Sequence, residues 1–166
     1  MGAAKGRSEG MTLFLSTFVN KIDKKGRISV PATFRQALAQ QSFQGIVVFR
    51  SYKFPAIEGM GIERMQRLSA SVDELDLFSD MQDDLTATIF ADSQLLPFDG
   101  EGRVILPEPL LVHAGIQTEA AFVGRGATFQ IWNPRDFEAQ QLLARQRVQE
   151  KQATVKMRSG LQGEGE

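Results

Sequence analysis

An aspartate followed four residues later by an arginine occurs twice in the chain, in KIDKKGRISVPATFR (residues 21–35) and in PFDGEGRVILPEPLL (residues 97–111). A glycine stands just before each arginine, so the motif residues are Asp23, Gly26 and Arg27, and Asp99, Gly102 and Arg103. Residues of these types could support two kinds of chemistry. Two carboxylates that share a proton form the dyad of an aspartic hydrolase, whereas a carboxylate that pairs with its own arginine positions a cation for recognition.

The residues that flank the aspartates favour the second chemistry. A catalytic dyad normally lies in Asp-Thr/Ser-Gly loops, whereas Lys24 and Gly100 follow the two aspartates here. An arginine close behind each carboxylate favours its ionised form, so we expect two separately paired carboxylates. The sequence therefore predicts no enzymatic activity, and a hydrolase with Asp23 and Asp99 as its dyad is the catalytic alternative.

The same residues also suit two tight turns. Aspartate at the start of a turn accepts backbone N–H groups or steadies the arginine that follows, and glycine supplies the positive φ that a hairpin connection needs. We therefore expect Asp23, Gly26, Asp99 and Gly102 to be structural residues of the two turns.

The two motifs carry opposite charge. Residues 20–35 hold five basic residues and one acidic residue, a net charge of +4, whereas residues 96–111 hold one basic and three acidic residues, a net charge of −2. Basic side chains neutralise phosphates, and a two-stranded ribbon fits the major groove of DNA. We therefore predict double-stranded DNA as the partner. The candidate DNA-binding residues are Lys21, Lys24, Lys25, Arg27, Arg35 and Arg103.

These candidates are expected to have different roles. Lys24 and Lys25 at the turn tip would contact phosphates or enter the groove, and Arg27 would read a base or fix the turn. Arg35 would reach the DNA backbone from a helix. The second motif has a glycine and a glutamate where the first has two lysines, which argues against phosphate contact by that loop. It favours assembly instead, with the acidic unit of one subunit beside the basic unit of the next, a heterologous contact that closes into a ring when the rotation permits.

The composition limits the other classes of function. The 166 residues are 42% hydrophobic and 23% charged, which is ordinary for a globular protein, and the net charge of −1 gives no global attraction to DNA. There is no cysteine and His113 is the only histidine, so we expect no zinc site and no cofactor. No stretch approaches the roughly 20 apolar residues of a membrane span, so no membrane partner is expected. We also expect no small-molecule substrate.

The similarity between the two halves extends beyond the motifs. An offset of 76 residues aligns the motifs and the proline that follows each, and an offset of 75 then aligns Phe54 with Phe129 and Leu68 with Leu143. The order of elements is therefore repeated, which indicates a duplicated unit. One unit is too small to enclose a core, so two would pair around a pseudo-twofold axis. The predicted fold is α+β and mainly β, a small β-barrel of interleaved hairpins with short helices.

Each unit is predicted to contain a hairpin, a short helix, a second hairpin and a final helix. In the first unit these are strands over 18–23 and 27–30, a helix over 32–40, a strand over 45–50, a strand around 54–57 and a helix over about 62–68. The last helix of the second unit would begin at Pro134 and end near Glu150. The predicted division is a flexible arm over 1–12, a first repeat over 13–70, a helical connector over 71–92, a second repeat over 93–150 and a disordered tail over 151–166. Apolar residues at helical spacing support the connector: Leu75, Phe78, Met81, Leu85 and Ile89.

The doubled motif, with LFLSTFVNKID before the first copy and FQIWNPRDFEAQQ after the second, resembles the MraZ family, which is related to the AbrB-type (SpoVT-AbrB) swapped-hairpin DNA-binding domains. The resemblance covers roughly residues 11–150. It implies a tandem swapped-hairpin fold, a ring of many subunits, and binding to promoter repeats of the division and cell-wall gene cluster, including its own promoter, usually as a repressor. It also implies a cytoplasmic, nucleoid-associated protein.

An AbrB-like antitoxin is the alternative within DNA-binding proteins. Such a protein uses its hairpin for DNA and a disordered tail for a toxin, and the polar tail from Ala153 fits that function. Antitoxins of this type typically carry one unit per chain, however, so the duplication favours the regulator.

Overall fold

The computed structural model describes residues 12–152, 154 and 155, and the chain divides into two compact units, of which the first ends at Pro134 and the second begins at Arg135. The first half of the chain contains β1 (Thr17–Lys21), β2 (Arg27–Ser29), α1 (Ala32–Ala37), β3 (Gly45–Arg50), β4 (Ala56–Met60) and α2 (Ile62–Asp73). It is followed by α3 (Asp80–Leu85), the π-helix η2 (Thr86–Phe90), β5 (Gln94–Pro97), β6 (Arg103–Ile105), α4 (Glu108–Ala114), β7 (Glu119–Gly124), β8 (Phe129–Trp132) and α5 (Pro134–Lys151).

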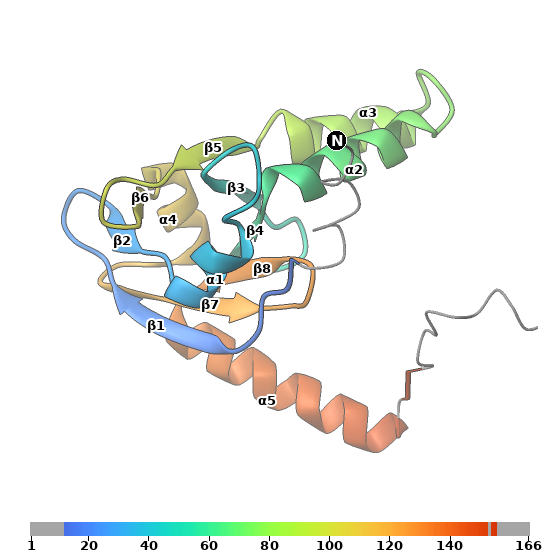
Figure 1. The fold of residues 1–166 in the computed structure, drawn as a ribbon. Helices are drawn as coiled ribbons and strands as arrows, with labels where there is room; N and C mark the ends of the chain where they lie inside the picture. The colour runs from blue at the N-terminus through green and yellow to red at the C-terminus, as the bar shows by residue number, and fades with distance from the viewer. Residues whose placement is uncertain (1–11, 153, 156–166) are drawn as a thin grey trace, which may run out of the picture. The chain divides into compact units, whose positions relative to one another are not determined.

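The strands of the two repeats are interleaved (Figure 1). Six antiparallel strands form one sheet in the order β1-β7-β8-β4-β3-β5, and β2 pairs with β6 in a separate two-stranded ribbon. The central pair is β4 with β8, and on either side the first strand of one repeat pairs with the third strand of the other: β1 with β7, and β5 with β3. This arrangement confirms a mainly β, mixed fold of swapped hairpins with short helices. The closure of these strands into a barrel stays a prediction.

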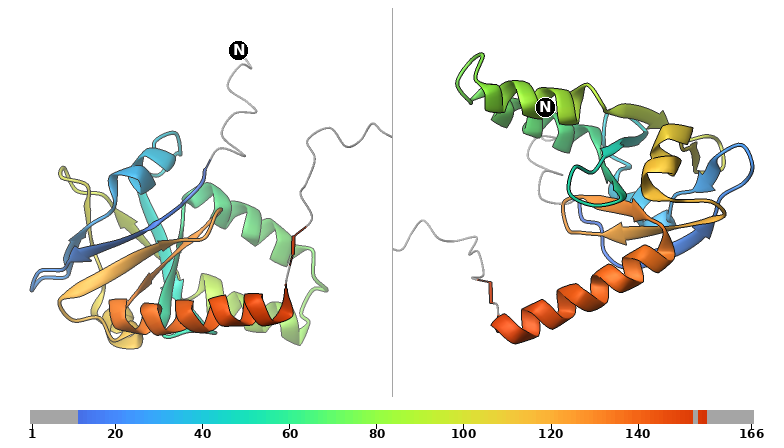
Figure 2. Two further views of the ribbon diagram at one scale, coloured as in Figure 1. Left: turned by 90° about the horizontal axis from the view of Figure 1, so that it is seen from below. Right: turned by 180° about the vertical axis from the view of Figure 1, so that it is seen from behind.

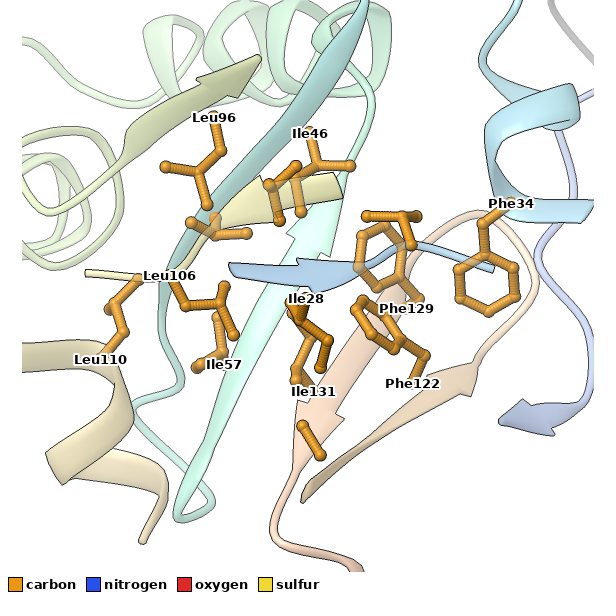
Figure 3. Close-up of a cluster of buried hydrophobic side chains, with 14 of the residues drawn as sticks. Ile28, Phe34, Ile46, Ile57, Leu96, Leu106, Leu110, Phe122, Phe129 and Ile131 are labelled. Carbon is orange, nitrogen blue, oxygen red and sulfur yellow. The ribbon is translucent and has the colours of Figure 1, made fainter. Parts of the chain in front are cut away.

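The main hydrophobic core lies between the two repeats (Figure 3). Ile28 of β2 and Val104 of β6 are each 1% exposed and are direct cross-strand partners. Beside them, Phe34 contacts Phe122 and Phe129, with ring centroids 6.2 and 5.2 Å apart. Because each repeat supplies about half of the apolar side chains, neither repeat could bury its own share alone.

A second hydrophobic cluster covers the other face of the β3–β4 hairpin. Val47, Phe49 and Met60 pack there with Met65 of α2 and Ile89 of η2. The packing explains why α2 is longer than predicted. It continues past Leu68 to Asp73, because the apolar face that contains Met65 also includes the buried Val72.

The predicted helical connector is interrupted. Helices α2 and α3 lie side by side as a helical hairpin (Figures 1 and 2). Phe78 has φ = 63°, a left-handed conformation that ends any regular helix, and the Ser79 side chain then caps α3 by accepting a bond from the Gln82 N–H. Leu75, Phe78 and Met81, which have helical spacing in the sequence, are all exposed and do not lie on one continuous helix.

Helix α5 begins at Pro134 and runs to Lys151, close to its predicted bounds, and none of its described side chains is buried. The predicted N-terminal arm and C-terminal tail lie largely outside the described residues, and so does the alternative start at Met11. No helix in the described part of the chain is both long and apolar enough to span a membrane.

Candidate nucleic-acid interface

The first turn is organised by Asp23. Its Oδ1 accepts the backbone N–H groups of Lys25, at 2.8 Å, and Arg27, at 2.9 Å, while its Oδ2 accepts Nε of Arg27 at 2.7 Å. Its carbonyl oxygen accepts the N–H of Gly26, whose φ is 87°. A β-carbon at position 26 would lie 2.8 Å from the carbonyl oxygen of Leu106, so this position requires glycine for both conformation and space.

The second turn repeats this geometry. Asp99 accepts the N–H groups of Glu101, at 2.8 Å, and Arg103, at 2.9 Å, and it accepts Nε of Arg103 at 2.8 Å. Gly102 has φ = 75° and donates its N–H to the carbonyl of Asp99. The two motifs are therefore the same local structure with different side chains at the tip.

The hydrogen bonds keep both aspartates ionised. The backbone N–H of Arg27 is the largest cause that lowers the pKa of Asp23 below its ordinary value of 3.8, and the Arg27 side chain and the Lys25 N–H lower it further. The N–H of Arg103 acts in the same way on the pKa of Asp99. A proton-sharing dyad needs one carboxyl with a raised pKa, so this geometry does not favour an aspartic hydrolase. The absence of catalysis stays a prediction.

Strands β2 and β6 join the two turns into one ribbon. Arg27 lies opposite Ile105 and Ser29 opposite Arg103, while the inward pair between them is Ile28 with Val104. The four residues of the other face, here called the ribbon face, are Arg27, Ser29, Arg103 and Ile105. The carbonyl oxygen of each turn glycine also accepts a hydrogen bond from the residue that follows the other strand of the ribbon. The Val30 N–H donates to Gly102 at 3.1 Å, and the Leu106 N–H donates to Gly26 at 2.9 Å.

The lysine candidates are exposed, but they differ in their neighbours. Lys24 and Lys25 lie at the tip of the turn between β1 and β2 and line a hollow of about 610 Å³ beside helix α4. Lys21, at the end of β1, is the cross-strand partner of Glu119 on β7, so a residue of opposite charge lies opposite it on the sheet. The positive charge available to a polyanion is therefore concentrated at the turn tip.

The two motif arginines differ at their terminal nitrogens. Arg27 donates a hydrogen bond from Nε to Asp23, and no described residue engages its two Nη groups. These two Nη groups, here called the fork, can donate hydrogen bonds to O6 and N7 of a guanine. Arg103 makes the same Nε bond, but its Nη2 also lies 2.9 Å from Oε1 of Glu101. Glu101 occupies the position in the second repeat that Lys25 has in the first. A glutamate at this position therefore forms an ion pair with the fork of Arg103.

The guanidinium of Arg35 contacts the backbone of the protein at Val30 and lies beside Gly102. Its Nε donates to the carbonyl oxygen of Val30 at 3.1 Å, and its guanidinium lies so close to Gly102 that a β-carbon there would be 2.6 Å from Nε. The 76-residue offset places Leu111 at the matching position of the other repeat. Leu111 lines the hollow beside Lys24 and Lys25.

The ribbon face also contains residues that sequence reasoning missed. Ser29 and Ile105 were not candidates, because only the cross-strand register shows that they lie beside the two arginines. The alternation of polar and apolar residues in Arg27-Ile28-Ser29-Val30 was a signal for Ser29, whereas Ile105 lies in the apolar run Val104-Ile105-Leu106, which gives no such signal. In the part of the chain that the structure describes, no group of three or more His, Cys, Asp or Glu residues could hold a metal ion.

Known proteins are similar to this chain over most of its length. The chain is 42% identical over 146 residues to a protein of Rickettsia africae (strain ESF-5) named "Transcriptional regulator MraZ", covering 88% of this chain and 98% of the relative. The chain belongs to the MraZ family. A Rickettsia bellii (strain OSU 85-389) MraZ of the same name is 42% identical over 147 residues, with the same coverage. The family profile described as "MraZ protein, putative antitoxin-like" matches residues 89–158 of this MraZ family member.

Proposed function

We propose that this MraZ family member is a sequence-specific DNA-binding transcriptional regulator that performs no catalysis. The observation that carries the proposal is the first turn, where Asp23 holds Arg27 by Nε with its fork available and where Lys24 and Lys25 are exposed at the tip. Arginine forks read guanine and lysines neutralise phosphates, which are the two contacts that a DNA-binding ribbon requires. The relatives named as transcriptional regulators support the same function.

The biological role follows from the family resemblance. The regulator acts as a repressor of the division and cell-wall gene cluster, including its own promoter, and it works in the cytoplasm in association with the nucleoid. It assembles into a ring, in which the acidic second motif of one subunit lies beside the basic first motif of the next. A ring presents several basic turns to tandem promoter repeats, so weak single contacts add up through effective concentration.

Salt-dependent DNA binding tests the proposal. Fluorescence anisotropy of a labelled fragment from upstream of the protein's own gene is measured at several salt concentrations with wild type and with Lys24→Ala/Lys25→Ala. We expect the double variant to lose affinity and to reduce the log–log salt slope by about two, since each phosphate contact contributes about one. Lys53→Ala/Arg64→Ala is the matched control, because both side chains are exposed and lie outside the two aspartate turns and the β2–β6 ribbon.

Two outcomes would redirect the proposal. Equal binding by wild type and the Lys24→Ala/Lys25→Ala variant would mean that DNA contacts another surface. A stable monomer that ignores DNA at low salt would contradict both the DNA-binding function and the ring. Native mass spectrometry of the intact protein gives the subunit number, and a reporter fused to the promoter gives the direction of regulation.

The antitoxin alternative is favoured by one finding, the antitoxin-like description of the matching family profile. An antitoxin would bind a toxin as well as DNA. A co-purifying protein that is lost when residues 153–166 are removed would support this alternative. A variant without these residues that still regulates its promoter and never had such a partner would argue against it.

A further inference from the structure

We propose that Ile105, which comes from the second repeat, determines DNA specificity by contacting the C5-methyl group of a thymine next to the base that Arg27 reads. This inference rests on the proposed DNA-binding function of the ribbon. It assigns a base contact to a residue of the second repeat, although the negative charge of the second motif argues against phosphate contact there. The ligand chemistry is a major-groove step that presents a guanine edge and a thymine methyl side by side.

The cross-strand register places Arg27 and Ile105 side by side. Arg27 and Ile105 are direct partners in the antiparallel β2–β6 pair, so their side chains lie on the same face of the ribbon. The next residues inward, Ile28 and Val104, are 1% exposed and point into the core. Strand alternation therefore directs Arg27 and Ile105 together away from the protein.

Ile105 is an exposed apolar residue between two buried ones. Its side chain is 58% exposed although its neighbours in the chain, Val104 and Leu106, are 1% and 2% exposed. Single exposed apolar residues are common on protein surfaces. Ile105 differs from other exposed apolar residues, such as Leu77 and Val112, because it lies directly opposite an arginine whose two Nη groups have no partner among the described residues.

The spacing of a cross-strand pair is similar to the spacing of neighbouring bases in DNA. Directly opposite residues have β-carbons about 4.5–5.5 Å apart, and successive bases on one strand are about 3.4 Å apart. Two long side chains from one cross-strand pair can therefore reach neighbouring bases. Guanine offers two acceptors to an arginine fork, and thymine offers a methyl group to an apolar side chain, so Arg27 and Ile105 match such a step.

The other pair on the ribbon face fits a supporting role. Ser29 lies opposite Arg103, and a serine hydroxyl can donate to or accept from either kind of base. The fork of Arg103 is engaged by Glu101 at 2.9 Å, so this end of the ribbon face offers weaker base contact. The reading pair is thus composed of one residue from each repeat, which gives the duplication a function in recognition as well as in folding.

A methyl-deletion experiment tests the proposal. Duplexes that bind wild-type protein are selected from a random pool, and each thymine of the selected duplex is then replaced singly by deoxyuridine, which lacks only the C5-methyl group. Binding is measured by competition anisotropy with the full-length protein at one fixed salt concentration. We expect one thymine per reading pair whose replacement weakens wild-type binding about fourfold, the equivalent of one buried methyl or methylene group.

The protein variants complete a double-mutant cycle. Ile105→Ala should weaken binding to the thymine duplex by a similar factor and should then be insensitive to deoxyuridine, whereas Ile105→Val should keep part of the sensitivity. Leu77→Ala, a truncation of another exposed apolar side chain between α2 and α3, should bind and discriminate like wild type. Because Ile105 is exposed, these substitutions should leave the fold intact.

Several results would overturn the proposal. It is wrong if no deoxyuridine replacement affects wild type, if Ile105→Ala stays as sensitive as wild type, or if the selected duplexes contain no guanine–thymine neighbours. The DNA-binding function would stand in all three cases, provided that Arg27→Ala loses affinity. If the random pool yields no bound duplex and Arg27→Ala changes nothing, the proposed function fails as well.

Discussion

At the scale of single residues, the two motifs share one scaffold and differ in what the arginine can still bind. The bonds from Asp23 and Asp99 to backbone N–H groups and to Nε are the same within 0.1 Å. The difference lies in the tip residue, which is Lys25 in one copy and Glu101 in the other. One charge reversal is therefore enough to change an available guanidinium fork into an internal ion pair.

The pKa of Asp23 tests how the turn is held. Since the Arg27 backbone N–H is the largest cause of its lowered pKa, Arg27→Ala should leave the pKa of Asp23 below 3.8, whereas a turn held by the ion pair alone would return it to that value. Carboxyl NMR titration of both proteins measures this. A lowered folded-state pKa stabilises the fold above 3.8, and this contribution is lost as the pH falls through the folded-state value.

Removal of the Glu101 charge should free the Nη2 group of Arg103 from its ion pair. Glu101→Gln breaks the 2.9 Å pair with Arg103 and removes one negative charge from the ribbon, so DNA affinity should rise and the log–log salt slope should become steeper by about one. Salt-dependent anisotropy checks this against Glu74→Gln, an exposed glutamate after helix α2. Equal affinity for Glu101→Gln and wild type would show that Arg103 takes no part in binding.

At the scale of elements, the turn glycines fix the two hairpins against each other. Gly102→Ala places a β-carbon at positive φ and 2.6 Å from Nε of Arg35, so we expect a loss of about 1–2 kcal/mol in the free energy of unfolding from the conformation alone. Gly100→Ala, two residues earlier, meets no atom within 4 Å and should be nearly neutral. Urea denaturation compares the two variants, and equal stability would mean that Arg35 and the turn adjust freely.

At the scale of the whole molecule, the interleaved strands make the two repeats dependent on each other. A chain cut between Asp73 and Asp80 separates β1 from its partner β7 and β5 from its partner β3. We therefore expect residues 12–73 alone to be unfolded or to pair with a second copy, and the mixed halves to recover a folded complex. Circular dichroism and light scattering measure folding and mass. A folded monomer of either half would contradict this interdependence.

Much of the fold could be predicted because its signals are local. Gly26 and the alternation around Ile28 indicate a hairpin, and Pro134 marks the start of α5, which the structure confirms. The connector could not be predicted as well. Phe78 adopts a positive φ that favours glycine, and Ser79 then starts a new helix, so the helical spacing of the apolar residues did not reveal the break in the connector.

The candidate site was predicted only in part. Its charged residues could be recognised because lysine and arginine beside a turn glycine are visible in one short segment. Their neighbours could not, because Glu119 opposite Lys21, Ile105 opposite Arg27 and the contact of Arg35 with the second turn all join residues far apart in the chain.

The sequence by itself determined the two turns, since each is held by bonds that span at most four residues and depend on one aspartate and one glycine. Only the tertiary structure decided which residues share the ribbon face. Strand register is set where Ile28 and Val104 pack together in the core, and a shift of one residue would turn every side chain to the other face. The pairing of Arg27 with Ile105 is therefore a consequence of how two distant repeats bury their apolar surfaces.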